Sequence, residues 1–81
     1  MYDSGTKVSF IKSDVMLWPS RHPWIDVDVL SQGCVLALPS GREISFVPSV
    51  DGRCLKADRD CTGYAEWIGI KNGEVVEAEV V

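Results

Sequence analysis

The sequence lacks the long apolar segments of membrane proteins and the basic clusters of nucleic-acid-binding proteins. Apolar runs such as residues 15–18 and 35–38 hold only four residues, whereas a membrane-spanning helix needs about 20. The eight Lys and Arg residues are scattered along a chain of net charge −4, and binding to phosphates depends on clustered cations. We therefore predict no membrane segment, and direct nucleic-acid binding is disfavoured.

Motifs that carry catalysis or bind phosphate are also missing. The seven glycines are isolated and begin neither a G-x-x-x-x-G-K-[ST] run nor a G-x-G-x-x-G run. The only histidine is His22, and so short a chain would struggle to hold nucleophile, base and oxyanion donors together. The carboxylate pairs Asp26 with Asp28 and Asp58 with Asp60 supply too few oxygens for a calcium loop. The sequence predicts neither an enzyme nor a bound cofactor.

The three cysteines do not form a metal-binding pattern. Zinc sites use paired ligands at C-x₂₋₄-C spacing, whereas Cys54 and Cys61 are separated by six residues and Cys34 stands alone. We expect free structural thiols, with Cys34 in the core, and no metal site. The alternative is a Cys54–Cys61 disulfide, which would contribute about 2–3 kcal/mol by closing a small loop but would not persist in a reducing cytoplasm.

The 81 residues have the length of one small domain, so residues 1–81 are predicted to form a single unit with a small core. The N-terminus has neither the basic region nor the apolar segment of a secretory signal. If the chain is complete, we expect the protein to stay in the cytoplasm. A small core also leaves a homodimer open, because the apolar end Val80-Val81 either closes a barrel or pairs across a two-fold axis.

Short strand-like runs separated by turn residues make up most of the chain. The predicted strands are residues 8–12, 15–18, 24–30, 34–38, 42–47, 64–70 and 74–81. In the run 24–30, Ile25, Val27 and Val29 alternate with Asp26 and Asp28, which is typical of a half-buried strand. The stretch 48–63 is expected to be irregular, with at most one short helical turn in the fold.

The turns between these runs predict how the strands pair. Asn72-Gly73 favours a type I′ hairpin between the last two runs, and the short loops within 24–47 predict an antiparallel meander. Six or seven short strands in 81 residues favour an all-β, mainly antiparallel fold. We expect a small barrel or curled sheet that resembles SH3-like or OB-like barrels in its rhythm of strands and turns, because closure removes exposed edges.

The aromatic residues around the loop 19–23 provide the best functional lead. Trp18 and Trp24 flank this loop, and Trp24 is expected on the solvated face of its strand. An exposed Trp near Arg and His is typical of an interaction hot spot. The candidate binding residues are Trp18, Arg21, His22, Trp24, Asp26 and Asp28. The alternative is that Trp18 and Trp24 cap the end of the barrel as a second small core.

These features favour a non-enzymatic protein-interaction module, such as an adaptor or small inhibitor of the kind that mobile elements and phages encode. It would dock a protein partner through the aromatic loop or through the acidic C-terminal hairpin, where Glu66, Glu77 and Glu79 alternate. The alternative function is a small β-barrel that binds single-stranded nucleic acid or a small ligand by stacking on Trp18 and Trp24.

Overall fold

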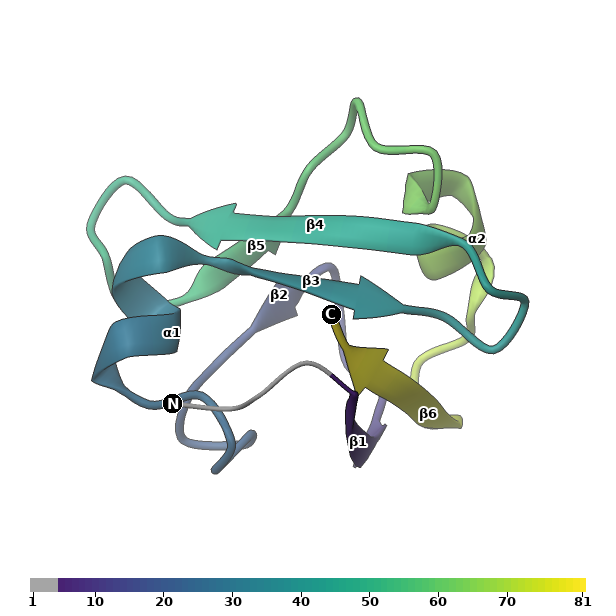
Figure 1. Cartoon of the computed structure of the whole chain (residues 1–81), viewed down its shortest axis with the longest axis horizontal. Helices are drawn as coiled ribbons and strands as arrows, with labels where there is room; N and C mark the ends of the chain where they lie inside the picture. The colour runs from purple at the N-terminus through teal and green to yellow at the C-terminus, as the bar shows by residue number, and fades with distance from the viewer. Residues whose placement is uncertain (1–4) are drawn as a thin grey trace.

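The computed structural model describes residues 5–81, in which six strands form one antiparallel sheet with two short helices (Figure 1). The elements are β1 (Thr6–Ile11), β2 (Met16–Leu17), α1 (Val27–Gln32), β3 (Cys34–Ala37), β4 (Glu43–Pro48), β5 (Leu55–Ala57), α2 (Tyr64–Gly69) and β6 (Val75–Val80). The strand order in the sheet is β1-β6-β3-β4-β5-β2. The predicted all-β, mainly antiparallel fold with a curled sheet is confirmed.

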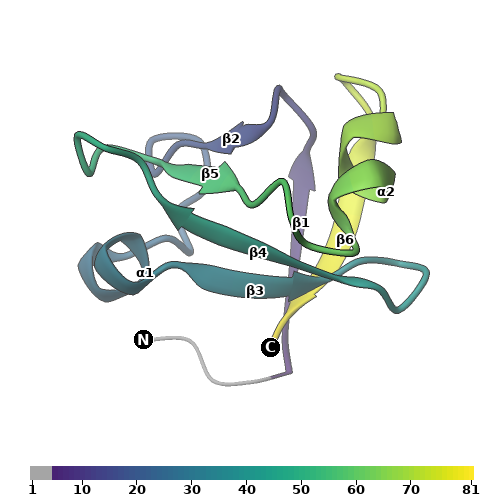
Figure 2. The same ribbon diagram turned by 90° about the horizontal axis from the view of Figure 1, so that it is seen from above.

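The sheet curls into a half-barrel. β1 and β2 lie at the two ends of the strand order although they follow one another in the chain. In Figure 2, β1 and β6 run across the direction of β3 and β4, with α1 and α2 at opposite ends of these strands. The curl leaves the alternate side chains of each strand facing a shared interior.

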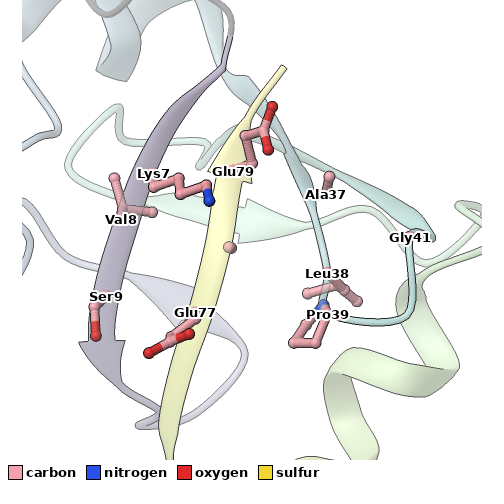
Figure 3. Close-up of a pocket in the computed structure, with 10 residues that line it drawn as sticks. Lys7, Val8, Ser9, Ala37, Leu38, Pro39, Gly41, Glu77 and Glu79 are labelled. Carbon is pink, nitrogen blue, oxygen red and sulfur yellow. The ribbon is translucent and has the colours of Figure 1, made fainter.

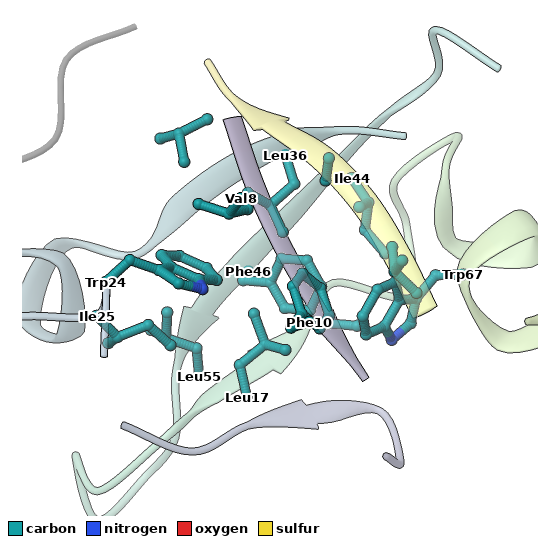
Figure 4. Packing of buried hydrophobic residues seen from close by; sticks show 14 of the residues in the cluster. Val8, Phe10, Leu17, Trp24, Ile25, Leu36, Ile44, Phe46, Leu55 and Trp67 are labelled. Carbon is teal, nitrogen blue, oxygen red and sulfur yellow. The ribbon is translucent and has the colours of Figure 1, made fainter. Parts of the chain in front are cut away.

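The interior is filled by side chains from nearly every element (Figure 4). Trp67 of α2 packs edge-on against Phe46 of β4, with ring centroids 5.1 Å apart, and Phe10 of β1 lies 6.0 Å from Trp67. The largest fully buried side chains are Trp67, Phe46, Leu17, Leu36, Ile44, Leu55 and Cys54. Burying such side chains supplies the main favourable free energy of folding, at about 1.5–3 kcal/mol each.

The predicted strand over residues 24–30 is wrong, because residues 27–30 belong to helix α1 and residues 24–26 form the loop that leads into it. Asp26 caps the helix, with its Oδ1 accepting a hydrogen bond from the Val29 N–H at 2.9 Å. Asp28 lies in the first turn, where a carboxylate is favoured by the helix dipole. The two acidic residues therefore mark the start of a helix, with Asp26 as its cap and Asp28 in its first turn. They do not mark the solvent-facing side of a strand.

The predicted first strand of the C-terminal hairpin, residues 64–70, is also wrong. Residues Tyr64–Gly69 form α2, and β6 pairs instead with the whole of β1. Tyr64, Trp67 and Ile70 recur every three residues and all pack on the core. In so short a run, this helical spacing is hard to distinguish from alternation. The fold thus contains two six-residue helices, against the single helical turn expected.

The other predicted elements agree better with the structure. β1, β2, β3 and β4 lie within or near the predicted runs, and β3 and β4 form an antiparallel hairpin with Leu36 opposite Ile44. The predicted meander is wrong in its first strand, which is α1. The stretch 48–63, expected to be irregular, contains the short strand β5. No helix in residues 5–81 is long and apolar enough to cross a membrane.

Candidate functional site

A groove of about 660 Å³ crosses the outer face of the sheet beside β6 (Figure 3). Lys7 and Ser9 of β1 line one side of it, and Pro39, in the turn after β3, lines the other. Glu77 and Glu79 of β6 stand between these two sides, and Figure 3 shows the Lys7 side chain directed towards β6. The groove therefore combines carboxylates with an apolar wall.

The register of β1 and β6 determines how the charges in the groove are balanced. Lys7 lies directly opposite Glu79, so a cation and a carboxylate are neighbours on the outer face. Glu77 lies opposite Ser9, which carries no charge. Both glutamates are exposed. Glu77 is therefore the carboxylate of the groove without a cation directly across from it.

β6 has one fully paired edge and one edge that is paired only in part. On the β1 side, each of its six residues has an antiparallel partner. On the β3 side, only Val80 and Glu79 have partners, which are Leu36 and Ala37. The groove lies where this second ladder ends.

Pro39 accounts for the place where the β3 ladder ends. In antiparallel pairs every second residue exchanges hydrogen bonds with its partner. The Val81 N–H donates to the Val35 carbonyl oxygen at 2.9 Å, so continuing this alternation would place Pro39 opposite Glu77. Proline has no N–H to donate, and the chain turns there towards β4. A groove opens because the strand that would have filled it leaves the sheet.

Of the predicted binding residues, Trp18 and Arg21 lie at the surface, on a second pocket of about 400 Å³. Trp18 is 40% exposed, and Arg21 Nη1 donates to Ser13 Oγ at 3.3 Å. The Asp14 N–H donates to Asn72 Oδ1 at 2.9 Å, which links this pocket to the turn before β6. The pocket is mainly polar, and Trp18 is its one aromatic residue.

His22 and Trp24 are buried, so the expectation that Trp24 is exposed is wrong. The His22 Nδ1 donates to the Trp18 carbonyl oxygen at 2.9 Å, since a carbonyl can only accept. The His22 ring packs edge-on against Phe10 with centroids 5.0 Å apart, and Trp24 lies 6.2 Å from Phe10. The alternative, in which Trp18 and Trp24 form a second small core, is also wrong, because Trp24 belongs to the main core and Trp18 remains at the surface.

Asp26 and Asp28 belong to α1 and do not share a strand face with Trp24. The hydrogen bond from the Val29 N–H holds the pKa of Asp26 below its usual value of 3.8. Asp28 is exposed. The six candidate residues thus fall into three places: a surface pocket, the core and a helix terminus. The structure does not bring them together as one site.

The cysteines are free thiols, and the alternative of a Cys54–Cys61 disulfide is not realised. Burial raises the pKa of Cys34 to about 11. Burial would also raise the pKa of Cys61, but hydrogen bonds from Ser45 and Gly63 outweigh it and leave this pKa below its usual value. Within residues 5–81, no three His, Cys, Asp or Glu side chains are grouped so that they could hold a metal ion.

Lys12 is a buried cation that the sequence reasoning missed. Its Nζ donates to the Ile70 carbonyl oxygen at 3.2 Å and lies 4.9 Å from the centroid of a Trp67 ring. Burial lowers the pKa of Lys12. Its position two residues after Phe10 and four after Val8, on the inward face of β1, was the signal that could have revealed it. Lys12 joins the end of β1 to the end of α2.

The sequence predicts the glutamates of the groove but not the groove itself. Glu77 and Glu79 alternate with Ala78 and Val80 in the last predicted strand. Lys7 and Pro39 gave no signal, because their places beside β6 depend on pairing between distant parts of the chain.

The fold and the groove together define a class: a small antiparallel half-barrel with a grooved, acidic outer face. Comparison with known protein families, with characterised proteins and with solved structures finds no match.

Proposed function

We propose that the protein is a non-enzymatic interaction module that binds a basic segment of a protein partner in the groove along β6. The observation that carries this proposal is Glu77, an exposed carboxylate with no cation opposite it, in a groove with an apolar side. A Lys or Arg side chain of the partner would complement Glu77, while its apolar stem would contact Pro39.

Charge favours a protein partner over a nucleic acid. The chain carries a net charge of −4, and the groove places two glutamates beside a single lysine. Phosphates would be repelled by these carboxylates. Stacking on both Trp18 and Trp24 is also disfavoured, because Trp24 is buried. A module of this size suits an adaptor or a small inhibitor acting in the cytoplasm, of the kind that phages and mobile elements encode.

The test is affinity capture from a nuclease-treated extract on immobilised protein. The parent is compared with the double variant Glu77→Lys/Glu79→Lys and with Asp28→Lys/Asp60→Lys, which makes the same change of charge at exposed positions in α1 and in the loop before α2. Urea unfolding of all three proteins first establishes that each is folded.

A protein retained by the parent and by the Asp28/Asp60 variant, but lost with the Glu77/Glu79 variant, would support the proposal. Equal retention by all three would overturn the groove as the docking site. If the parent captures no protein from the nuclease-treated extract, the assignment as a protein-interaction module is wrong.

A further inference from the structure

We infer that the partner segment binds as an added β-strand on the unpaired edge of β6. This inference rests on the proposed function and deepens it, because it specifies the backbone conformation and the side-chain pattern of the partner. Strand addition is a common way for a sheet to bind an extended peptide, since main-chain hydrogen bonds provide affinity and alternate side chains provide specificity.

The hydrogen-bonding direction along β6 identifies the unpaired groups. The Lys12 N–H donates to the Glu74 carbonyl oxygen at 2.8 Å, so the even-numbered residues of the following strand direct their backbone groups towards β1. Val75 and Glu77 therefore direct their N–H and C=O groups to the other edge. On that edge, the pairing with β3 reaches only to Glu79.

Space is available beside Glu77 because β3 turns away from β6 after Ala37. On this edge of β6, the groove separates Glu77 and Glu79 from the lining residues Ala37, Leu38, Pro39 and Gly41, and it also extends over β6 to Lys7 and Ser9. An extended segment entering there would take the place that β3 vacates at Pro39. It would continue the sheet alongside Val75 and Glu77, whose backbone groups lack a neighbouring strand.

The outward side chains of β6 specify what the added strand should carry. Glu77 and Val75 are two residues apart on the same face, and Val75 lies opposite Ile11. Val75 and Ile11 are 65% and 62% exposed and make an apolar patch next to the carboxylate. A partner residue beside Glu77 should be Lys or Arg, and the outward residue beside Val75 should be apolar. The expected pattern is basic-x-apolar in an extended segment.

A second copy of the chain fits this edge less well than a basic peptide does. Antiparallel pairing of two β6 edges would bring the Glu77 residues of the two copies within two residues of each other. Like charges at neighbouring cross-strand positions are unfavourable. Charge complementarity therefore points to a basic segment as the occupant, and self-association becomes an outcome of the test.

The test uses ¹⁵N-labelled protein and a blocked synthetic peptide, Thr-Lys-Thr-Val-Thr-Lys-Thr, whose pattern reads the same in both directions. One control peptide replaces each Lys with Glu. Two further control peptides keep the lysines. One carries backbone N-methyl groups on its odd-numbered residues and the other on its even-numbered residues, so that each lacks the N–H donors of one edge of the strand. Amide hydrogen exchange at each residue of β6 is measured with and without peptide.

We expect the Lys peptide to slow exchange of the Glu77 and Val75 amides by about tenfold, because a new hydrogen bond protects them. The amides of Val76 and Ala78 should change little, since they already face β1. N-methylation of the set that faces β6 should abolish binding, and the Glu peptide should not bind.

Three results would overturn the inference, and they separate it from the proposed function. Equal binding of the Lys peptide and both N-methylated peptides, without protection of Glu77, would leave the acidic groove as a docking site but exclude strand addition. Equal behaviour of the Lys and Glu peptides would remove the proposed function as well. Protection of Glu77 that rises with protein concentration alone would assign the edge to a second copy.

Discussion

The three tryptophans occupy three different environments. Trp67 is fully buried at the centre of the core, Trp24 is buried beside His22, and Trp18 is 40% exposed. The Nε1 of Trp67 has no hydrogen-bond partner among residues 5–81, and an unpaired buried N–H is unfavourable. Burial of the large apolar ring outweighs this penalty, since an aromatic side chain removes about 150–250 Å² of surface from water.

Replacing Trp67 should therefore destabilise the protein mainly through the volume of side chain that is lost, and only slightly through the loss of the indole N–H. Trp67→Ala is expected to lower the free energy of unfolding by about 3–5 kcal/mol through the cavity it leaves. Trp67→Phe is expected to cost less than about 2 kcal/mol, because it keeps one six-membered aromatic ring in the core and removes the unpaired N–H. Urea unfolding of both variants measures the difference. Equal losses would show that cavity volume is not the main factor.

The three thiols should differ in their rates of alkylation. Cys61 is partly exposed, and its pKa lies below its usual value despite the opposing effect of burial. Cys34 has a pKa of about 11, and Cys54 is buried. Because the thiolate is the reactive form, iodoacetamide at neutral pH should modify Cys61 first. Mass spectrometry of digested samples provides the order, and faster labelling of Cys34 would contradict this prediction.

At the scale of elements, the short helix α1 depends on its N-terminal cap. The Val29 N–H bonds to Asp26 and lowers its pKa below 3.8. A lowered carboxyl pKa contributes stability that is present above the unfolded value and is lost as the pH falls through the folded value. Asn caps helices about as well as Asp but carries no charge. Asp26→Asn isolates the contribution of that charge.

We expect Asp26→Asn to unfold at lower urea concentration than the parent at pH 7. The difference should shrink as the pH falls below 3.8 and should vanish below the folded pKa of Asp26. Urea midpoints of both proteins across the acid range check this, since the other carboxylates titrate in both and cancel. A difference that is independent of pH would mean that the charge of Asp26 does not act through the cap.

The junction between α1 and β3 requires glycine for two reasons. Gly33 has a φ of +80°, and a Cβ added there would collide with the Phe46 carbonyl oxygen. Gly41, in the β3–β4 turn, has a φ of +94° but open space around the added Cβ. Both positions have a positive φ, which costs a residue with a Cβ about 1–3 kcal/mol, and only Gly33 adds the collision.

Gly33→Ala should therefore lower the free energy of unfolding clearly more than Gly41→Ala, which provides the matched control. The extra loss reflects a shift of β4 or of the α1–β3 junction to relieve the contact with Phe46. Thermal or urea unfolding of the two variants measures it. Similar losses at both positions would show that the junction moves freely and that the close approach is unimportant.

At the scale of the whole molecule, the acidic charge should control how tightly the groove holds its partner. With a net charge of −4 and Glu77 uncompensated, binding of the Lys peptide should weaken by about tenfold between low and high salt, because salt screens charges at the surface. Titration at several ionic strengths measures this. An affinity independent of salt would indicate docking through apolar contacts instead, such as Val75 and Ile11.

Much of the architecture was accessible from residue patterns. The alternation of apolar and polar residues correctly located β1 and β6, and turn residues correctly separated β3 from β4. The two helices were missed because each has only six residues, which is less than two turns and too few to establish a period. The candidate site was predicted only in part: its glutamates follow from the alternation of β6, whereas Lys7 and Pro39 join them through pairing with distant strands.

The sequence by itself determined the class of fold, the antiparallel curl and the acidic character of the last strand, because these depend on local alternation, turn residues and composition. Only the tertiary structure decided that Trp24 and His22 face inward, that β6 pairs with β1, and that β3 leaves β6 at Pro39. The physical reason is that burial and strand pairing are contacts between distant residues. Their free energy depends on the assembled core and not on the order of neighbouring residues.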